Sequence, residues 1–300
     1  MSEFNVLSLF DGMSCGQLAL RRAGIKYDNY YASEVDKYAI EVTQTNFPDT
    51  IQLGDVTKVK GADLPKIDLL MGGSPCQGFS MSGKGLNFSD ARSKLFFEFV
   101  RLLEECDPKY FLLENVKMKK VHRDIISSYV GVRPIQINSA LVSAQNRVRL
   151  YWTNIAGVKQ PEDRGILLKD IIDNNIENGS NKEPEVVCPQ IRNKSKTVRS
   201  SGLKSYDRHE WDSIDDSHHH KLTTIECERL QTVPDNYTNH VSNAQRYKML
   251  GNGWTVAVIA HILKNLYKKP RDKQPVGLFP LHEILEVNSE SNSLTIKESV

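Results

Sequence analysis

Cys76 is the residue of this chain best suited to nucleophilic chemistry. It lies in the segment Gly-Gly-Ser-Pro-Cys-Gln-Gly, residues 72–78, directly after the apolar run at residues 67–71. Glycines let a backbone approach a ligand closely, and Pro75 stiffens the loop. A thiol at such a turn can be activated by backbone N–H groups or a nearby cation. The alternative is a small buried hydrophobic side chain, which is the commonest role of a lone cysteine.

A second candidate site is the turn Phe-Asp-Gly-Met-Ser-Cys-Gly at residues 10–16, between a predicted strand and a predicted helix. The alternative is an ordinary tight turn, but a helix N-terminus also suits a nucleotide-like cofactor. The G-x-G-x-x-G pattern of dinucleotide sites is absent. Glu34 ends the next predicted strand, about 20 residues on, where an acid can accept both ribose hydroxyls. This combination predicts an adenosine cofactor such as S-adenosylmethionine. Asp55 either accepts the adenine amino group or caps a loop.

Charged side chains also occur at two later strand ends. Glu114 follows four apolar residues, so partial burial should raise the pKa of its carboxyl and let it donate a hydrogen bond to a bound base. Arg147 and Arg149 occupy alternate positions of an extended segment, which places them on one face at the edge of the site. The alternatives are a helix cap or surface ion pair for Glu114 and a solvated strand edge for the arginines.

Composition argues against several other classes of site. The five cysteines are odd in number and form no C-x-x-C pair, unlike a disulfide framework or the common zinc patterns. Three histidines at 218–220 fit no zinc spacing, so we predict an exposed loop and no metal site. No run of 18 apolar residues and no signal-peptide pattern occurs, which predicts a cytoplasmic protein that does not enter a membrane. The formal net charge is +2, so any surface for nucleic acid has to be local.

The elements that must position these residues alternate in type. Strands are predicted at 6–10, 30–35, 67–71, 110–113, 135–137 and 150–153, and helices at 14–24, 37–47, 96–106 and 255–266. Ser14 and Gln17 match a capping box, and Gly24 a C-cap. This order predicts an α/β fold with a doubly wound, mostly parallel sheet. Ligands of such sheets lie beyond the carboxyl ends of the strands, where the candidate residues gather.

Residues 156–222 have a different character. They are polar and show little apolar periodicity, which predicts a small irregular region. Residues 223–269 return to regular structure, and residues 270–300 form a tail without a chemical signal. We therefore expect a main domain at 1–155 that is completed by 223–269.

Taken together, the motifs resemble those of the DNA cytosine-5 methyltransferase family. They occur in the family's order: Phe10-Asp11-Gly12, Glu34, Gly54-Asp55-Val56, Pro75-Cys76-Gln77, Glu114-Asn115-Val116, Gln145-x-Arg147-x-Arg149, Arg229-Leu230-Gln231 and Gly251-Asn252-Gly253. The resemblance covers roughly residues 4–155 and 222–267. Trp254 and the run at 95–99 are closer to the animal de novo enzymes. The short region 156–222 is similar to the recognition regions of those enzymes and of small phage or bacterial ones.

The resemblance implies the S-adenosylmethionine-dependent methyltransferase fold, with 156–222 as the target-recognition region. It implies methyl transfer to ring carbon 5 of a cytosine flipped out of duplex DNA. Cys76 would attack ring carbon 6, while Glu114 would hydrogen-bond ring nitrogen 3 and the exocyclic amine. Arg149 would hold the 2-oxo group, and Arg147 would support the Cys76 loop or bind a phosphate.

The same resemblance implies two sets of binding residues. Contacts to S-adenosylmethionine are expected from Phe10, Asp11, Gly12, Ser14, Gly16, Glu34, Val35, Asp55, Val56, Pro75, Asn252, Trp254 and Thr255. Contacts to DNA are expected from Ser80, Arg192, Lys194, Lys196, Arg199, Lys204 and Arg208. The alternative interpretation of the basic run at 190–208 is a solvated loop that does not contact DNA.

Two other functions stay open at this point. A cytosine-5 methyltransferase acting on transfer RNA shares these motifs, but usually carries a Cys-Phe-Thr segment that 156–222 lacks. A catalytically inactive homologue that binds DNA would tend to lose the nucleophile or the cofactor acid, and both are present. Restriction–modification, phage self-protection and epigenetic marking are all compatible with the motifs, and we expect a monomer.

Overall fold

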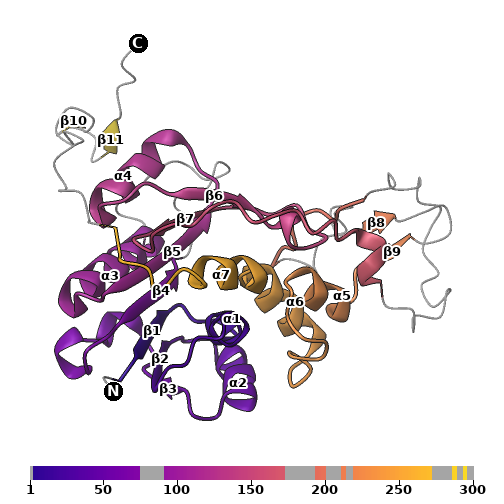
Figure 1. Ribbon diagram of the computed structural model, residues 1–300, viewed down its shortest axis with the longest axis horizontal. Coiled ribbons are helices and arrows are strands. Elements are labelled where there is room, and N and C mark those ends of the chain that lie inside the picture. The colour runs from indigo at the N-terminus through magenta and orange to yellow at the C-terminus, as the bar shows by residue number, and fades with distance from the viewer. Residues whose placement is uncertain are drawn as a thin grey trace.

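The computed structural model describes residues 3–74, 91–172, 193–200, 211–213, 219–271, 286–288 and 293–295. Its centre is a seven-stranded sheet in the order β3-β2-β1-β4-β5-β7-β6 (Figure 1). The strands are β1 Asn5–Leu9, β2 Asn29–Ser33, β3 Ile51–Gln52, β4 Leu69–Gly73, β5 Tyr110–Val116, β6 Ile135–Asn138 and β7 Val148–Thr153. β7 pairs antiparallel with both β5 and β6, and the other pairs of this sheet are parallel. The predicted α/β fold with a mostly parallel sheet is confirmed.

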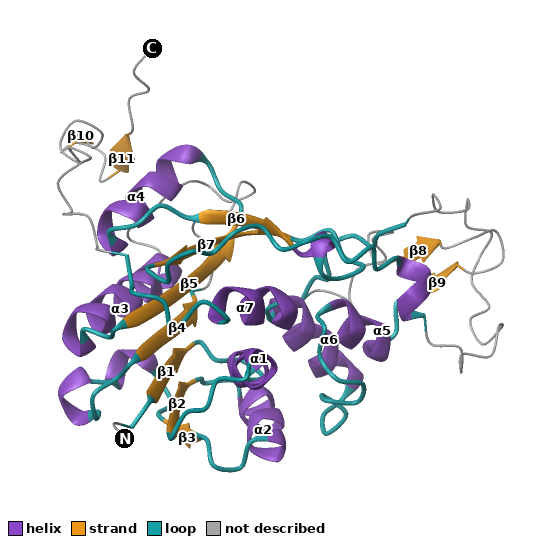
Figure 2. Cartoon of the chain, in the orientation of Figure 1, coloured by secondary structure: helices purple, strands orange, loops and turns teal. Residues whose placement is uncertain are grey.

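Helices cover both faces of the sheet (Figure 2). They are α1 Cys15–Ala23, α2 Lys37–Asn46, α3 Ala91–Cys106, α4 Lys120–Val130, α5 Thr224–Leu230, α6 Asn243–Asn252 and α7 Val256–Leu263. Short 3-10 turns lie at Val56–Lys58, Gly61–Asp63, Ser139–Leu141 and Leu168–Ile171. Two further strand pairs are β8 Trp211–Ser213 with β9 His219–Lys221, and β10 Glu286–Asn288 with β11 Ser293–Thr295.

The apolar strand sequences divide between two cores because successive side chains of a strand point to opposite faces. In β5, Leu112 joins the core with α1 and α7, whereas Phe111 and Leu113 join the core with α3 and α4. Both faces are therefore buried, which explains why these strands are continuous apolar runs without polar alternation.

The start of α1 differs from its predicted form. Ser14 has φ 60° and ψ 43°, in the left-handed region, and its side chain caps no helical N–H. Instead Gln17 Nε2 donates to Ser14 Oγ over 2.8 Å. The predicted capping box is therefore wrong, because the turn at 10–14 imposes a backbone that an N-cap does not adopt. The predicted C-cap at Gly24 is confirmed, with φ 73° and an N–H that donates to Leu20 and Arg21 carbonyls.

Three helices, α4, α5 and α6, and one strand direction had no counterpart among the predicted elements. α6 carries mixed polar and apolar residues without a clear period, whereas α4 does bury Ile125, Ile126 and Val130 at helical spacing. The reversal of β7 depends on the path of the chain between β6 and β7. Among the described residues, no helix combines the length and the apolar composition that a bilayer span requires.

Candidate functional site

The carboxyl ends of β1, β2, β4 and β5 bring the candidate residues to one edge of the sheet. Hydrogen bonds tie these ends together across the strands. Asp11 N–H donates to Ser33 O over 3.2 Å, and Asn115 Nδ2 donates to Ser74 Oγ over 3.2 Å. The last strand position of β4, Gly73, pairs with Glu114 of β5. The predicted shared edge is therefore present, and the segment with Cys76 continues directly from it.

The turn after β1 has an unusual backbone. Phe10, Gly12 and Ser14 have φ of 56°, 60° and 60°. Only glycine adopts this region without a steric penalty, and each of the other two costs roughly 1–2 kcal/mol. Gly16 is required by packing, because a Cβ there would lie 2.5 Å from Tyr30 Oη. Strain of this kind accumulates where a backbone is shaped around a ligand.

Glu34 closes the turn from the neighbouring strand. Its Oε2 accepts from Gly12 N–H over 2.8 Å, and its Oε1 accepts from Val35 N–H over 2.7 Å and Asp36 N–H over 2.8 Å. A carboxylate has about four acceptor sites, so this fixed carboxylate retains capacity for a ribose hydroxyl. Val35 next to it is 72% exposed, which leaves an apolar surface beside the acid.

Asp11 offers the best test of whether this edge fits the cofactor. Its Oδ1 accepts from Tyr30 Oη over 2.7 Å, while its Oδ2 is buried without a hydrogen-bond partner among the described residues. Burial raises the pKa of Asp11 to about 6, the surrounding hydroxyls oppose that rise, and the charge of Glu34 adds to it. An orphaned carboxylate oxygen suits a cationic group. The ammonium of S-adenosylmethionine is such a group, so these residues fit the expected cofactor.

We expect the buried Asp11 to make stability depend on pH. Its folded-state pKa of about 6 lies above its ordinary value of 3.8, so its contribution is full below pH 4 and is lost as pH rises through 6. Relative to Asp11→Asn, the wild type should lose up to about 3 kcal/mol of unfolding free energy between about pH 4 and pH 8. Urea denaturation of both proteins across this range measures the difference. A difference that does not change with pH would contradict the prediction.

The remaining cofactor candidates have mixed surroundings. Asp55 Oδ1 accepts from the N–H and the hydroxyl of Thr57, over 3.0 and 2.9 Å, and these hydrogen bonds lower the pKa of Asp55. Val56 is buried in the core with α3. Thr255 is also buried, and its hydroxyl donates to Gln231 Oε1 over 2.9 Å and accepts from Ser139 Oγ over 2.8 Å. Val56 and Thr255 thus have structural roles, while Asn252 is exposed.

Glu114 forms an ion pair at the other side of this edge. Its Oε1 lies 3.0 Å from Arg149 Nε, with the two side chains 12% and 14% exposed. Arg149 also donates to Val148 O over 2.9 Å. The sequence placed both residues at this edge but did not pair them with each other.

Trp254 lies between the turn after β1 and the Glu114–Arg149 pair. A Cβ on Gly73 would come within 2.8 Å of Trp254 Nε1 and 3.2 Å of Glu114 Oε2. The indole therefore lies against the backbone at the end of β4, beside the Glu114 carboxylate. This contact brings the turn between α6 and α7 to the same edge as the ends of β4 and β5.

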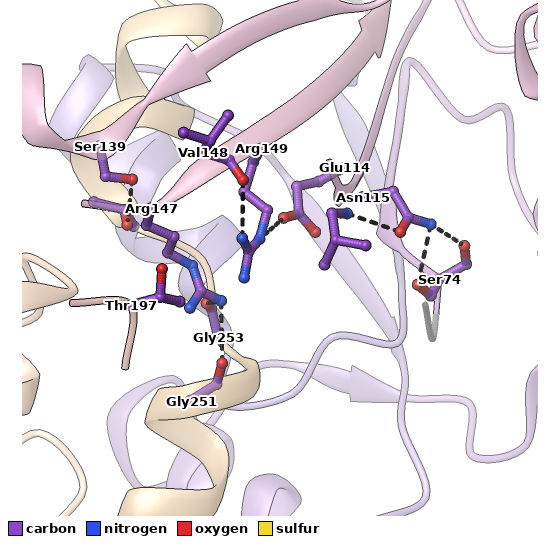
Figure 3. Close-up of polar contacts among 12 residues, drawn as sticks. Ser74, Glu114, Asn115, Ser139, Arg147, Val148, Arg149, Thr197, Gly251 and Gly253 are labelled. Atoms are coloured by element: carbon purple, nitrogen blue, oxygen red, sulfur yellow. Dashed lines mark hydrogen bonds and ion pairs between the residues drawn. The ribbon is translucent and has the colours of Figure 1, made fainter. Parts of the chain in front are cut away.

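Arg147 takes a different direction from Arg149 (Figure 3). Its guanidinium donates to the carbonyls of Val198 over 3.0 Å, Gly251 over 3.1 Å and Gly253 over 2.9 Å. The residue is 3% exposed, and burial, with the charge of Arg149 second, lowers its pKa to about 9. The two arginines therefore lie at the same edge of the site, as predicted, but they bond to different groups. Sequence reasoning missed Val198 entirely, since no local signal marks it.

The residues expected to bind DNA are described only in part. Lys194 Nζ donates to Ala140 O, Ser143 O and Ile166 O over 2.7, 3.1 and 2.5 Å. Its three protons are thus used within the fold, which gives Lys194 a structural role in place of the expected phosphate contact. Lys196 is half-buried and Arg199 exposed. The other predicted positions, Pro75, Cys76, Ser80, Arg192, Lys204 and Arg208, lie outside the described residues.

Comparisons with known proteins give the family of this chain. The family model for C-5 cytosine-specific DNA methylase matches residues 4–129 and 134–268. The type II methyltransferase M1.ScrFI of Lactococcus lactis subsp. cremoris is 29% identical over 88% of this chain and 78% of its own length. The type II methyltransferase M.NlaX of Neisseria lactamica is 27% identical over 88% of this chain and 96% of its own length.

The fold has close structural counterparts as well. The methyltransferase EhMeth of Entamoeba histolytica superposes with a TM-score of 0.74 over 89% of this chain and 98% of that one, at 16% identity. The family model spans most of the chain, and the residues it spans include the turn after β1, Glu34, Glu114 and both arginines. The chain therefore belongs to the C-5 cytosine-specific DNA methylase family and is a DNA cytosine-5 methyltransferase.

Proposed function

We propose that this enzyme transfers a methyl group from S-adenosylmethionine to ring carbon 5 of a cytosine flipped out of duplex DNA, through a covalent adduct with Cys76. The observation that carries the proposal is the Glu114–Arg149 ion pair of 3.0 Å, which is only slightly exposed and lies beside Gly73. Gly73 is three residues before Cys76 in the chain. A carboxyl and a guanidinium side by side are complementary to the hydrogen-bonding edge of a cytosine.

The chemistry begins with extrusion of the base, because the faces of a stacked base are covered. The Cys76 thiolate forms a bond to ring carbon 6, and the electrons of the double bond between carbons 5 and 6 move into the ring toward nitrogen 3. Glu114 stabilises this charge by donating its carboxyl proton to nitrogen 3 in a hydrogen bond. Arg149 turns from Glu114 to the 2-oxo group, and the Glu114 carboxylate takes up the proton that it donates from water as the base enters.

The turn after β1 and its neighbours would hold the cofactor. Glu34 accepts a ribose hydroxyl, Asp11 Oδ2 pairs with the ammonium group, and Asp55 accepts from the adenine amino group. The backbone at 10–14, Val35 and Trp254 line the same space. When bound, S-adenosylmethionine supplies an electrophilic methyl group for carbon 5. The carbon-5 proton then passes to water, the bond between Cys76 sulfur and carbon 6 breaks, and the aromatic ring is restored.

DNA binding is proposed for the region at 156–222, with 1–155 and 223–269 as the catalytic part and 270–300 as a C-terminal tail. Lys196 and Arg199, together with Ser80, Arg192, Lys204 and Arg208, are the residues proposed to contact DNA. Phosphate contacts of this kind position the duplex and make affinity fall with salt. Because Lys194 is bonded to three carbonyls, we leave it out of this set.

The acceptor is tested directly with methyl-labelled S-adenosylmethionine. We expect label in high-complexity duplex DNA, with bisulfite sequencing of the product placing it on carbon 5 of cytosine. A duplex in which every cytosine is already 5-methylated is the matched control and should take up no label. Label in transfer RNA but not in DNA would replace the proposal with the RNA alternative. Cofactor binding without transfer to either acceptor would show an inactive homologue.

A further inference from the structure

Residues 193–200 run beside the segment that leads into β7. Asn146 N–H donates to Ser195 O over 2.8 Å, and Ser195 N–H donates to Ala144 O over 2.7 Å. Thr197 Oγ1 adds a bond to Asn146 O of 2.6 Å, and Val198 N–H donates to Gln145 Oε1 over 2.9 Å. Both backbone and side-chain bonds therefore hold this part of the proposed recognition region to the segment that carries Arg147.

The same segment also lies against the end of α6. A Cβ on Gly251 would collide with the carbonyl carbon of Arg199 and the amide nitrogen of Ser200. Only a glycine allows the two backbones to come so close. Gly251 lies in the last turn of α6, directly before the turn that carries Trp254, so the recognition region and the cofactor edge meet at this point without an intervening side chain.

Arg147 joins the two sides of this contact. It donates to Val198 O on one side and to Gly251 O and Gly253 O on the other, at 2.9 to 3.1 Å. The forked guanidinium can address several carbonyls at once, which a single ammonium cannot do with the same geometry. Because the group is almost fully buried, a displacement of either side would leave donors or acceptors unpaired, which is unfavourable.

We propose that Arg147 is a positioning residue that couples DNA binding by the recognition region to cofactor binding at the Trp254 turn. This inference rests on the proposed function for the identity of the two ligands. DNA that binds the segment at 193–200 restrains Val198 O, which restrains the guanidinium and, through it, the carbonyls of Gly251 and Gly253. The coupling is reciprocal, since each ligand must raise the affinity of the other by the same factor.

The coupling is measured as a ratio, the Kd for S-adenosylhomocysteine without DNA divided by the Kd with a saturating duplex that the enzyme methylates. Both values are determined by calorimetry. We expect this ratio to be about 5 or more for the wild type and to fall close to 1 for Arg147→Lys. A purely structural arginine would change both Kd values and leave the ratio intact, so the ratio separates the two roles.

Arg246→Lys is the matched control. Arg246 is also buried, at 8% exposure, and pairs with Glu228 over 3.1 Å, but it does not join the two sides. Its variant should keep the wild-type ratio. If Arg147→Lys does not fold, Thr197→Val is tested in its place. This substitution removes the half-exposed hydroxyl that donates to Asn146 O, and so weakens the same contact between 193–200 and the segment before β7. We expect Thr197→Val to lower the ratio.

Several outcomes would overturn the coupling role. A wild-type ratio of 1 would do so, as would an unchanged ratio in Arg147→Lys or, where that variant does not fold, in Thr197→Val. An enzyme that methylates DNA but gives one of these results refutes the coupling role alone. An enzyme that binds neither S-adenosylhomocysteine nor duplex DNA refutes the proposed function, and the coupling role with it.

Discussion

Cys76→Ser is expected to lower kcat for methyl transfer to duplex DNA by about 10³-fold or more, because the proposed thiolate nucleophile is replaced by a much weaker one. At neutral pH a serine hydroxyl is almost entirely protonated, whereas a few per cent or more of a cysteine is thiolate. Single-turnover transfer from methyl-labelled S-adenosylmethionine measures the loss. The Kd for S-adenosylhomocysteine should stay near its wild-type value, since the cofactor is proposed to lie on the turn after β1 and on Glu34.

A covalent trap separates loss of the nucleophile from loss of the fold. Duplex DNA with 5-fluorocytosine cannot release a proton from carbon 5, so the enzyme should remain bonded to the base and survive denaturation. We expect this adduct with the wild type and not with Cys76→Ser. Cys106→Ser is the matched control, because Cys106 is a half-buried residue of α3 in neither proposed site. An adduct formed by the Cys76 variant would refute the mechanism.

Glu114→Gln is expected to lower kcat by about 10²- to 10³-fold. The amide keeps the shape of the side chain but has no proton acidic enough to stabilise charge at ring nitrogen 3. The change also removes the partner of Arg149 from a pair whose side chains are only 12% and 14% exposed. Breaking such a pair leaves a poorly hydrated charge behind, so the variant should also unfold at lower urea concentration.

A second glutamate–arginine pair provides the control. Glu98 and Arg101 on α3 lie 2.7 Å apart but are 24% and 32% exposed, and exposed pairs of this kind contribute about 0–1 kcal/mol. Glu98→Gln should therefore change neither kcat nor the urea midpoint measurably. Equal effects of the two substitutions, or wild-type kcat in Glu114→Gln, would contradict the role assigned to Glu114.

Much of the candidate site could be read from residue types and spacing. Continuous apolar runs predicted strands buried on both faces, and parallel strands necessarily bring their carboxyl ends to one edge. Glu34 and Glu114 follow such runs directly, and both lie at that edge in the structure. The acid about 20 residues after the turn accepts a hydrogen bond from Gly12 N–H.

The partners of the charged groups could not be predicted in the same way. Arg149 was expected to act on a base, yet it forms an ion pair with Glu114 across β5 and β7. Asp11 is bonded to Tyr30, which carries no motif. Lys194 lies in a basic run typical of phosphate contacts, but its ammonium is enclosed by three carbonyls. A basic residue in such a run can contact a ligand only if its N–H groups are not already bonded to acceptors within the fold.

The sequence by itself determined which side chains reach the working edge of the sheet, because the positions of the strands along the chain and the alternation of their side chains follow from short-range apolar patterns. The tertiary structure alone decided what each of them bonds to there. Arg147 shows the difference most clearly, since its acceptors Val198 and Gly251 lie 51 and 104 residues further along the chain. No local pattern encodes such a pairing. It exists because the segment at 193–200 and the end of α6 bring two distant backbones against one buried guanidinium.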